Sequence, residues 1–225
     1  GKWERRTEAP MTMARAWHAT AAAEGKLFAI GGNNGTCHTR TAEYLDLRLS
    51  SPAQWRAAPE MRYKRFMPAA CSLNGQIIVA GGYGGVGDIA ASKCDHLDAV
   101  EALGPGSDRW IPLPPLPTPL SRLSLAAVRG RIFAIGGFAG DFALQTVFSY
   151  DPRTRFWKQE ADMAIRRASF AAVTDRLDNV IFAIGGYNAR LFSDTVEVWD
   201  ARRGGAWRPG PRLSSARAYM AACSF

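Results

Sequence analysis

The sequence has little of what marks several large protein classes. Its 225 residues include three histidines and four cysteines, and the cysteines form no CxxC pair. This pattern does not suggest a disulfide-stapled secreted scaffold, so free thiols are expected at Cys37, Cys71, Cys94 and Cys223. No run of eighteen apolar residues occurs, and the opening GKWERRTEAP lacks the apolar stretch of a secretory signal. We therefore expect a soluble, cytoplasmic protein with no membrane partner.

Acidic residues are also scarce relative to basic ones. There are 20 Asp and Glu against 28 Lys and Arg, a formal net charge of +8, and 23 of the basic residues are arginine. Guanidinium groups bind carboxylates and phosphates through paired hydrogen bonds, so this excess predicts acidic partners. Carboxylate-rich peptides are favoured over nucleic acid.

A repeat dominates the rest of the sequence. An apolar segment ending in two glycines occurs four times, with the first glycine of each pair 49 to 55 residues after the previous one, at Gly31, Gly81, Gly136 and Gly185. Tryptophans recur at nearly the same spacing: Trp3, Trp55, Trp110, Trp157 and Trp207. Two columns in phase indicate a structural unit of about fifty residues.

Two further columns complete the unit. Short apolar segments beginning with arginine precede each glycine pair and follow the last: RAWHATA (15–21), RFMPAAC (65–71), RLSLAAV (122–128), RASFAAV (167–173) and RAYMAAC (217–223). A third type of segment follows each pair: AEYLD (42–46), VEALG (100–104), VFSYD (147–151) and VEVWD (196–200). Each unit thus contains four predicted strands.

Four antiparallel strands in about fifty residues are typical of a propeller blade. The whole chain resembles kelch repeats, through the double glycine ending the second strand, the aromatic-Asp near the end of the third and the tryptophan opening the fourth. Leu45 and Leu103 replace the usual tyrosine and Gly104 replaces the aspartate, so the first two blades have diverged.

The resemblance implies an all-β, kelch-type β-propeller. We expect four complete four-stranded blades at about 14–63, 64–120, 121–165 and 166–212, with partial blades at 1–13 and 213–225. Six blades are common in the family, so the chain is expected to be a segment of a longer protein.

The first strand of each blade should line the crowded propeller axis, where small side chains fit. Small pairs are found there in every unit: Ala19-Thr20, Ala69-Ala70, Ala126-Ala127, Ala171-Ala172 and Ala221-Ala222. Cys71 and Cys223 lie in the same segments, which predicts buried core thiols.

The arginines that open these segments are the leading candidate site. Arg15, Arg65, Arg122, Arg167 and Arg217 should form a ring at one mouth of the central channel, beside the residues that follow the double glycines: Asn33, Tyr83, Phe138 and Tyr187. Guanidinium groups among aromatic rings suit the capture of Asp or Glu in a peptide. An equally weighted alternative is that the arginines pair with neighbouring carboxylates such as Glu43, Glu101 and Glu197, or stack on tryptophan faces.

Three other patterns favour structural interpretations. The glycine-rich start of the long 82–100 loop matches GxGxxG, but antiparallel strands do not supply the helix that a nucleotide site needs. Cys37-His38 and Cys94-Asp95-His96 lack a familiar zinc spacing, so no metal is predicted. The RxxPxxP match within 109–119 coincides with a predicted fourth strand. No catalytic residue and no cofactor is expected, because no Ser/His/Asp set or close carboxylate pair is discernible.

Similarity to the kelch halves of BTB-kelch adaptors implies a non-catalytic protein-interaction module. It would be the substrate-binding part of a cullin-RING ubiquitin ligase, recognising acidic segments and reaching the ligase through regions outside this chain. The alternatives are an actin-binding, cytoskeletal kelch protein and a kelch-type sugar-acid epimerase.

Overall fold

The computed structural model describes residues 10–48, 54–86 and 94–223. These residues form 21 strands and no helix, and most strands belong to four antiparallel sheets of four strands each. In the part of the chain described, no helix has the length and apolar character needed to cross a membrane. The prediction of four complete blades of four strands is confirmed.

Each blade uses its strands in chain order from the inside outward. Blade 1 contains β1 (Ala19–Ala23), β2 (Lys26–Ile30), β3 (Ala42–Asp46) and β4 (Trp55–Ala58). Blade 2 contains β6 (Ala69–Leu73), β7 (Gln76–Ala80), β10 (Val100–Leu103) and β11 (Ile111–Leu113). Blade 3 contains β12 (Ser124–Val128), β13 (Arg131–Ile135), β16 (Val147–Asp151) and β17 (Phe156–Gln159). Blade 4 contains β18 (Ala171–Thr174), β19 (Val180–Ile184), β20 (Val196–Asp200) and β21 (Arg208–Pro209).

Two smaller sheets stand beyond the double glycines. One joins β5 (Tyr63–Phe66), β8 (Tyr83–Val86) and β9 (Asp95–His96), and the other is the hairpin of β14 (Phe138–Ala139) and β15 (Phe142–Ala143). Both extend the end of the propeller that carries the double glycines, which we call the mouth face.

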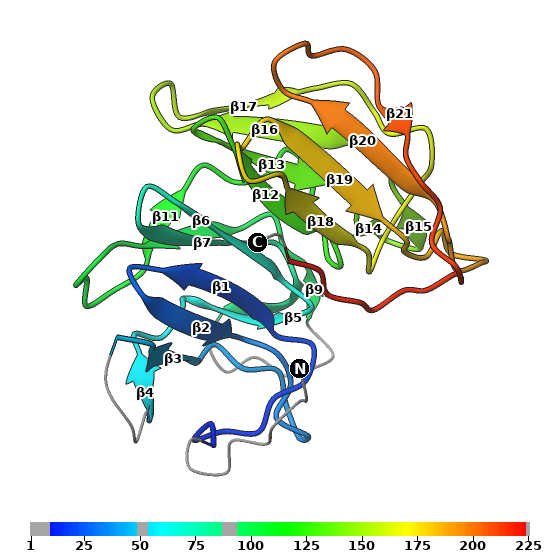
Figure 1. Ribbon diagram of the computed structural model, residues 1–225. Helices are drawn as coiled ribbons and strands as arrows, with labels where there is room; N and C mark the ends of the chain where they lie inside the picture. Colours follow the sequence, from blue (N-terminus) through cyan, green and yellow to red (C-terminus); the bar gives the residue numbers. More distant parts are fainter. Residues whose placement is uncertain (1–9, 49–53, 87–93, 224–225) are drawn as a thin grey trace.

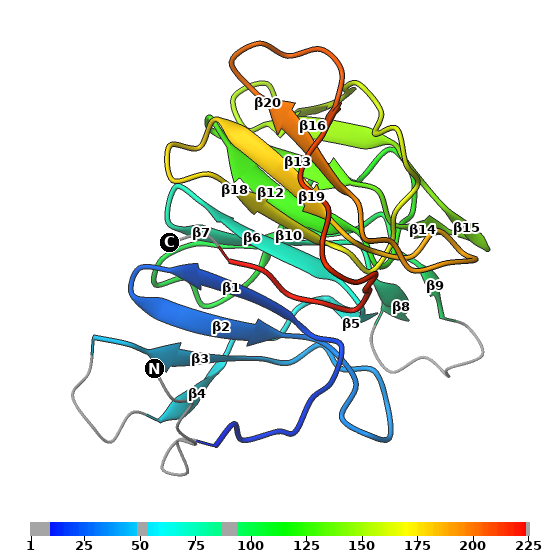
Figure 2. The ribbon, with the colours of Figure 1, turned by 45° about the vertical axis from the view of Figure 1, so that its right-hand side comes forward.

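The four blades lie side by side with their first strands innermost (Figures 1 and 2). β1 contacts β6, β6 contacts β12, and β12 contacts β18, so the first strands surround a common axis. The turns between strands 1 and 2 and between strands 3 and 4 lie at the end opposite the mouth face, which we call the hairpin face.

Apolar clusters between neighbouring blades form the core. Phe28, Ile77 and Trp110 pack between blades 1 and 2, and equivalent clusters fill the other two junctions. Three tryptophans of the column add a directed hydrogen bond, because the Nε1 of each donates to a carbonyl of the preceding blade. These bonds run from Trp110 to Pro59 at 2.8 Å, from Trp157 to Pro114 at 2.9 Å and from Trp207 to Ala161 at 3.0 Å.

The strand register corrects the alignment of the third repeat. In blades 1, 2 and 4 the first strand begins with an alanine that pairs with the last residue of the second strand: Ala19 with Ile30, Ala69 with Ala80 and Ala171 with Ile184. In blade 3 this position holds Ser124, which pairs with Ile135. The predicted small pair Ala126-Ala127 is therefore two residues too late. A shift of two keeps each side chain on the same face of the strand, so the apolar pattern alone did not reveal it.

The cysteines are free thiols, as predicted. Cys71 is partly buried against the core, and burial raises the pKa of its thiol to about 12. Cys223 is exposed, so the prediction of a buried core thiol at that position is wrong. It follows the last described blade and has no strand partner in the described residues.

Candidate functional site

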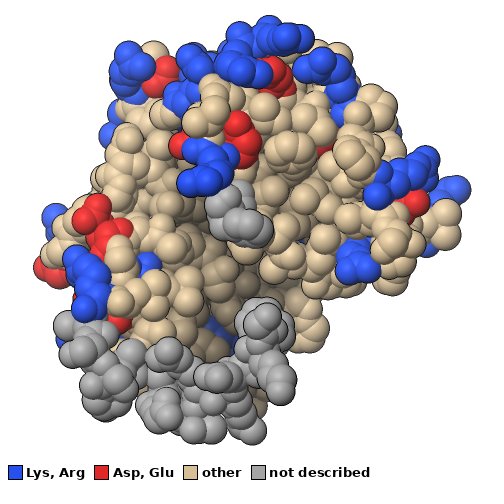
Figure 3. Space-filling model, in the orientation of Figure 1, with Lys and Arg blue, Asp and Glu red and all other residues tan. Residues whose placement is uncertain are grey.

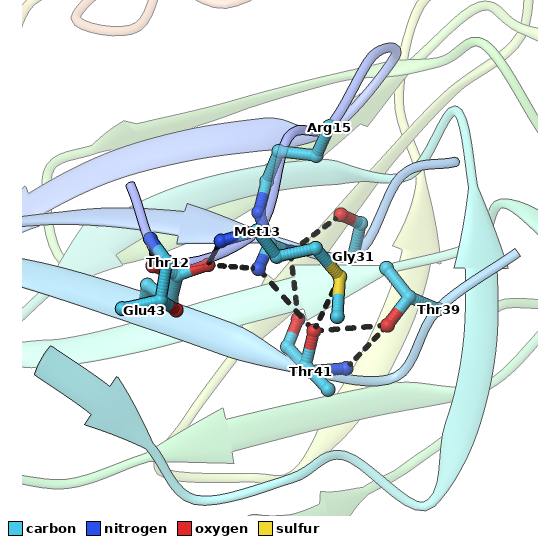
Figure 4. A network of polar contacts seen from close by, with 7 residues as sticks. All are labelled: Thr12, Met13, Arg15, Gly31, Thr39, Thr41 and Glu43. Carbon is cyan, nitrogen blue, oxygen red and sulfur yellow. Dashed lines mark hydrogen bonds and ion pairs between the residues drawn. The ribbon is translucent and has the colours of Figure 1, made fainter. Parts of the chain in front are cut away.

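The arginine that opens blade 1 lies inside the protein rather than at the mouth. Its side chain has 0% exposure and is held by a network of polar contacts (Figure 4). Arg15 Nη1 donates to the carbonyls of Gly31 at 2.9 Å and Thr41 at 3.1 Å, and Nη2 donates to Glu43 Oε1 at 2.6 Å. The guanidinium thus ties the double glycine to the third strand of the same blade.

The same arrangement recurs in blades 2 and 4. Arg65 donates to the carbonyl of Gly81 at 2.6 Å and to Glu101 Oε2 at 2.7 Å. Arg167 donates to the carbonyl of Gly185 at 2.6 Å and to Glu197 Oε1 at 3.0 Å. Both side chains are 0% exposed. The alternative pairing with Glu43, Glu101 and Glu197 is therefore confirmed.

Burial and pairing act against each other in these contacts. Burial lowers the pKa of Arg65 and Arg167, and the partner carboxylates oppose that shift. Burial would raise the pKa of Glu43, but hydrogen bonds from Arg15 and Thr12 outweigh it and hold the pKa below its usual range. With their donors directed inward, Arg15, Arg65 and Arg167 do not face a ligand at the surface, and the expected ring of five exposed arginines is not formed.

Arg122 occupies a different position from these three arginines. The carbonyl that accepts the hydrogen bond from the second glycine belongs to Arg65, Arg167 and Arg217 in three junctions, and to Leu120 in the fourth. Leu120 therefore replaces the arginine in blade 3, and Arg122 stands two residues further on. Arg15 and Arg65 precede the first glycine by 16 residues and Arg167 precedes it by 18, so the 14 residues between Arg122 and Gly136 did not by themselves reveal the break in the pattern.

At this later position one residue from each repeat joins a ring around the axis. Backbone N–H groups donate from Met67 to Trp17 at 3.0 Å, from Arg122 to Met67 at 3.1 Å, from Ser169 to Arg122 at 2.9 Å and from Tyr219 to Ser169 at 2.8 Å. All five residues have positive φ, between 51° and 56°. This left-handed conformation lets the chain turn from the mouth into the first strand, and it leaves the side chain of Arg122 at the mouth.

Arg217 is the one arginine of the buried column that is exposed in this structure. Its backbone carbonyl accepts from Gly186 N at 2.8 Å, as its equivalents do in the other repeats. Its Nη2 donates to Ser215 Oγ at 2.6 Å, and no carboxylate pairs with it in the described residues. Its position matches that of the buried arginines rather than that of Arg122.

The mouth face holds a cavity of about 470 Å³ beside Arg122, which we call the mouth cavity. Residues from blades 2, 3 and 4 line it: Phe66, Met67, Tyr83, His96, Ser121, Arg122, Phe138, Gly140, Asp141, Tyr187 and Ala189. Of the nine predicted site residues, it brings together Tyr83, Arg122, Phe138 and Tyr187.

Paired backbone hydrogen bonds set the aromatic residues at the cavity. Phe138 pairs with Ser121 and Tyr187 pairs with Ala168, each through two N–H to carbonyl bonds. The rings of Phe138 and Tyr187 stack with centroids 6.3 Å apart, and the Arg122 guanidinium lies 5.1 Å from the Phe138 centroid. A cation over an aromatic face is held in place without losing its hydrogen-bonding capacity.

Arg122 is the one Lys or Arg among the described residues that line the cavity. Its Nε donates to Met67 Sδ at 3.0 Å, and no carboxylate pairs with it in the part of the chain described. Asp141 also lines the cavity, on the turn between β14 and β15. The arrangement can bind a carboxylate at Arg122 and pack apolar or aromatic groups against the rings beside it.

In blade 1, Asn33 occupies the backbone position that Phe138 and Tyr187 occupy in blades 3 and 4, since it pairs with Ala16 through two backbone hydrogen bonds. Its side chain serves its own loop, because Oδ1 accepts from Gly35 N at 2.7 Å, and it does not line the mouth cavity.

Phe66, Met67, His96 and Asp141 line the mouth cavity without having been among the predicted site residues. Met67 and Arg122 each lie two residues after the position of the arginine column, which Arg65 and Leu120 hold in their repeats. The sequence identifies this pair only once Leu120 is recognised as a member of the column.

The other sequence patterns have structural roles. Tyr83–Val86 of the GxGxxG match is strand β8, paired antiparallel with β5 and β9, and Gly87 lies outside the described residues. His38 stacks on Phe66 and His96 contacts Tyr83 edge-on, with centroids 4.8 Å and 5.5 Å apart. Within the described residues no group of three His, Cys, Asp or Glu could hold a metal ion.

The proline-rich 109–119 segment contributes to blade 2. Residues Ile111–Leu113 form β11, the outermost strand, which pairs with β10. An outer strand tolerates Pro112 because only one of its edges needs hydrogen-bond donors.

Comparisons with known proteins agree with this architecture. Kelch repeat and BTB domain-containing protein 12 of Danio rerio is 28% identical over 187 residues, which cover 76% of this chain and 29% of that protein. An F-box/kelch-repeat protein of Arabidopsis thaliana is 29% identical over 196 residues, 85% of this chain and 45% of that protein. The chain thus spans less than half the length of either relative.

A solved structure shares the fold. The structure of YjhT superimposes with a TM-score of 0.79 at 16% identity, covering 94% of this chain and 70% of that one. The model of the kelch motif matches residues 14–62, 64–117, 119–164 and 166–214. With four matched repeats that coincide with four blades, this chain belongs to the kelch-repeat family.

Proposed function

We propose that this chain is a non-catalytic protein-interaction module that binds an acidic segment of a partner protein at the mouth cavity. The kelch repeats and the relatives named for them support a protein-interaction module. The observation that carries the finer proposal is Arg122, which is held over Phe138 at the axis with its charge unpaired by any carboxylate of the described residues.

The shape of the mouth face supports a peptide ligand. Phe142, Leu191 and Phe192 are more than half exposed on the loops of blades 3 and 4 that follow the double glycines. Phe192 contacts Tyr187 with ring centroids 5.7 Å apart, so the apolar surface continues from the cavity onto these loops. Exposed apolar patches of this kind mark interaction sites. A segment that places a carboxylate at Arg122 and apolar side chains on these loops would use both features.

The resemblance to BTB-kelch adaptors extends the proposal to the role of the partner. The bound segment would belong to a substrate of a cullin-RING ubiquitin ligase, and the ligase would be reached through regions outside this chain. The relatives whose names include BTB or F-box support this role.

The experiment is a quantitative comparison of proteins retained from a cell lysate by the wild type and by Arg122→Glu. Arg56→Glu is the matched control, since Arg56 is exposed on β4 and carries the same charge change away from the cavity. Peptides from the retained proteins are then titrated against each variant. Arg122→Ala should weaken an acidic peptide at least tenfold, as about 1.5 kcal/mol for a hydrogen bond to a charged group implies.

The same experiment separates the alternatives. Proteins that disappear with Arg122→Glu but not with Arg56→Glu, and that contain acidic segments, support the proposal. Retention of actin alone would point to a cytoskeletal protein. Turnover of a sugar acid by the wild type, lost with Arg122→Ala, would replace the module by an enzyme. Equal retention by both variants would overturn binding at Arg122.

A further inference from the structure

A second hollow lies on the hairpin face, between blades 3 and 4 and far from the mouth cavity. Its volume is about 260 Å³. Three arginines and one aspartate surround it, over a floor that includes two buried aromatic rings: Arg129, Arg131, Arg153, Asp151, Phe133 and Trp199. We call it the basic hollow.

Blades 1 and 2 form an equivalent hollow that serves as an internal reference. Lys26 and Arg131 begin the second strands of their blades, and Asp46 and Asp151 end the third strands. The reference hollow is lined by Glu24, Lys26 and Arg48, with Asp46 beside Arg48, so its charges balance. In the basic hollow Arg129 stands where Glu24 stands in blade 1, so its charged lining residues sum to +2, or to +1 when Glu160, 3.9 Å from Arg131 Nη1, is counted as Asp46 is in the reference hollow.

The ion pairing of the two hollows also differs. Arg48 Nε and Nη2 donate to Asp46 at 3.1 Å and 3.0 Å. Blade 4 repeats this pair between Arg202 and Asp200, at 3.0 Å and 2.8 Å. The same Asp-x-Arg spacing gives no such pair in blade 3.

In blade 3 the aspartate turns to another arginine. Asp151 Oδ2 lies 3.9 Å from Arg131 Nε. The Arg153 guanidinium therefore has no side-chain partner in the described part of the chain. Arg129 Nη1 donates at 3.0 Å to Asn179 Oδ1 of blade 4, a neutral amide that orients the guanidinium without neutralising it. Arg129 and Arg153 thus have no carboxylate partner among the described residues. Two such guanidinium groups suit a ligand group with two negative charges.

We propose that the basic hollow binds the phosphate monoester of a phosphorylated side chain on a protein partner. A phosphate monoester carries about 1.5 to 2 negative charges at neutral pH and accepts paired hydrogen bonds from guanidinium groups. Arginine clusters are a recurring means of recognising phosphorylated segments. Asp151 disfavours a further anion, so a single phosphate group fits better than a run of carboxylates.

The surroundings favour a protein segment over a free small molecule. The hollow is smaller than the roughly 300 to 1,000 Å³ of ordinary small-molecule sites. Lys and Arg side chains gather along the upper edge of the molecule, over the turns of blades 3 and 4 (Figure 3). Exposed Arg155 and Arg203 on these turns extend the positive charge beyond the hollow, where residues flanking a phosphorylated side chain would lie.

The chain also offers a substitution that removes the charge without harming the turn. Arg129 has a φ of 48° at the first position of the turn between β12 and β13, and Asn74 occupies the same position in blade 2 with a φ of 51°. Asparagine adopts this conformation more readily than arginine. Arg129→Asn should therefore keep or raise the melting temperature.

The test uses the immobilised chain and a pool of peptides with a central phosphoserine and random flanking residues, beside the matching serine pool. The wild type should retain at least tenfold more of the phosphoserine pool than of the serine pool. Arg129→Asn and Arg153→Gln should each reduce that retention at least tenfold. Arg48→Gln, the same change in the reference hollow, should leave it unchanged. Inorganic phosphate should displace the peptides only at a hundredfold excess or more.

Several outcomes would overturn the proposal. Equal retention of the two pools would exclude phosphate recognition, and equal loss with Arg48→Gln would show unspecific attraction by the net charge. Displacement by equimolar inorganic phosphate would indicate a site for the free anion. Binding of vesicles that contain a phosphoinositide, lost with Arg153→Gln while the phosphoserine pool is not retained, would assign the site to lipid. The mouth-face variant Arg122→Glu should not affect retention, so this test is independent of the proposed function.

Discussion

Blade 3 differs from the other three blades at one buried position near the mouth face, where its side chains are apolar and theirs form an ion pair. Blades 1, 2 and 4 use a buried arginine and glutamate, whereas blade 3 has Leu120 in place of the arginine and Phe148 in place of the glutamate. Leu120 is 1% exposed and Phe148 is 8% exposed. The backbone bond is the same with either residue, since Gly82 N donates to the Leu120 carbonyl at 2.8 Å, as Gly32 N donates to that of Arg65 at 2.7 Å.

The exchange extends to a third position. Glu43 and Glu197 each accept a backbone N–H from the chain that enters the blade, from Thr12 at 2.6 Å and from Ala164 at 2.7 Å. The residue in that place in blade 3 is Pro117, which has no N–H to satisfy. The fold thus accepts either apolar side chains or an ion pair at this position, and where the ion pair is used each buried charge needs its opposite charge.

The largest expected effect follows from removing one charge of a buried pair. Glu101→Gln keeps the shape of the side chain but leaves the fully buried Arg65 without its carboxylate. Such a change should lower the free energy of unfolding by about 3 to 5 kcal/mol. Urea denaturation followed by tryptophan fluorescence measures it.

The double variant Arg65→Leu, Glu101→Phe copies blade 3 and is the matched control. It removes both charges, so it should be less destabilised than Glu101→Gln by roughly 1 kcal/mol or more, although the N–H of Arg62 loses its acceptor. If the double variant is as unstable as the single one, the ion pair is required and blade 3 is no guide to the other blades.

Most of the fold could be predicted because it depends on patterns that repeat. The double glycines, the tryptophans and the aromatic-Asp segments recur at a nearly constant spacing, and each repetition supports the others. The assignment failed where the pattern breaks: in the third repeat the arginine of the column is replaced by Leu120, and Arg122 was aligned in its place. An arginine two residues away conserves the alternation of the strand, so nothing local contradicts the error.

The candidate site was predictable only in part, for a physical reason. Tyr83, Phe138 and Tyr187 were found because they follow an invariant landmark, and the backbone after the double glycine places them alike. Whether an arginine points to solvent or into a blade depends on carboxylates 28 to 36 residues away, such as Glu43 for Arg15 and Glu101 for Arg65. The sequence offered both outcomes, and the geometry of the third strand decides between them.

A smaller difference between the blades concerns a threonine on the loop before the third strand. Thr195 Oγ1 accepts from Arg167 Nη2 at 2.7 Å, whereas the equivalent Thr146 Oγ1 is buried without a partner because Leu120 stands where the arginine would be. Thr195→Val should therefore lower the free energy of unfolding by about 1 to 2 kcal/mol. Thr146→Val should leave it unchanged or raise it by up to about 1 kcal/mol. Equal losses in urea denaturation would mean that both hydroxyls are satisfied alike.

The smallest effect expected is on the acid dependence of stability. Arg15 and Thr12 hold the pKa of Glu43 below its usual range, so the unfolded chain takes up a proton at this site before the folded one does. The resulting stabilisation is fully present above the ordinary glutamate pKa of about 4.3 and is lost as pH falls through the lower pKa of the folded state.

Replacing the Arg15–Glu43 pair by the residues of blade 3, as Arg15→Leu, Glu43→Phe, removes the titrating group. The free energy of unfolding of this variant should therefore fall less steeply than that of the wild type between about pH 5 and pH 3. Parallel curves for the two proteins would show that the acid sensitivity arises at the other carboxylates, and that the two ways of filling this position respond alike to pH.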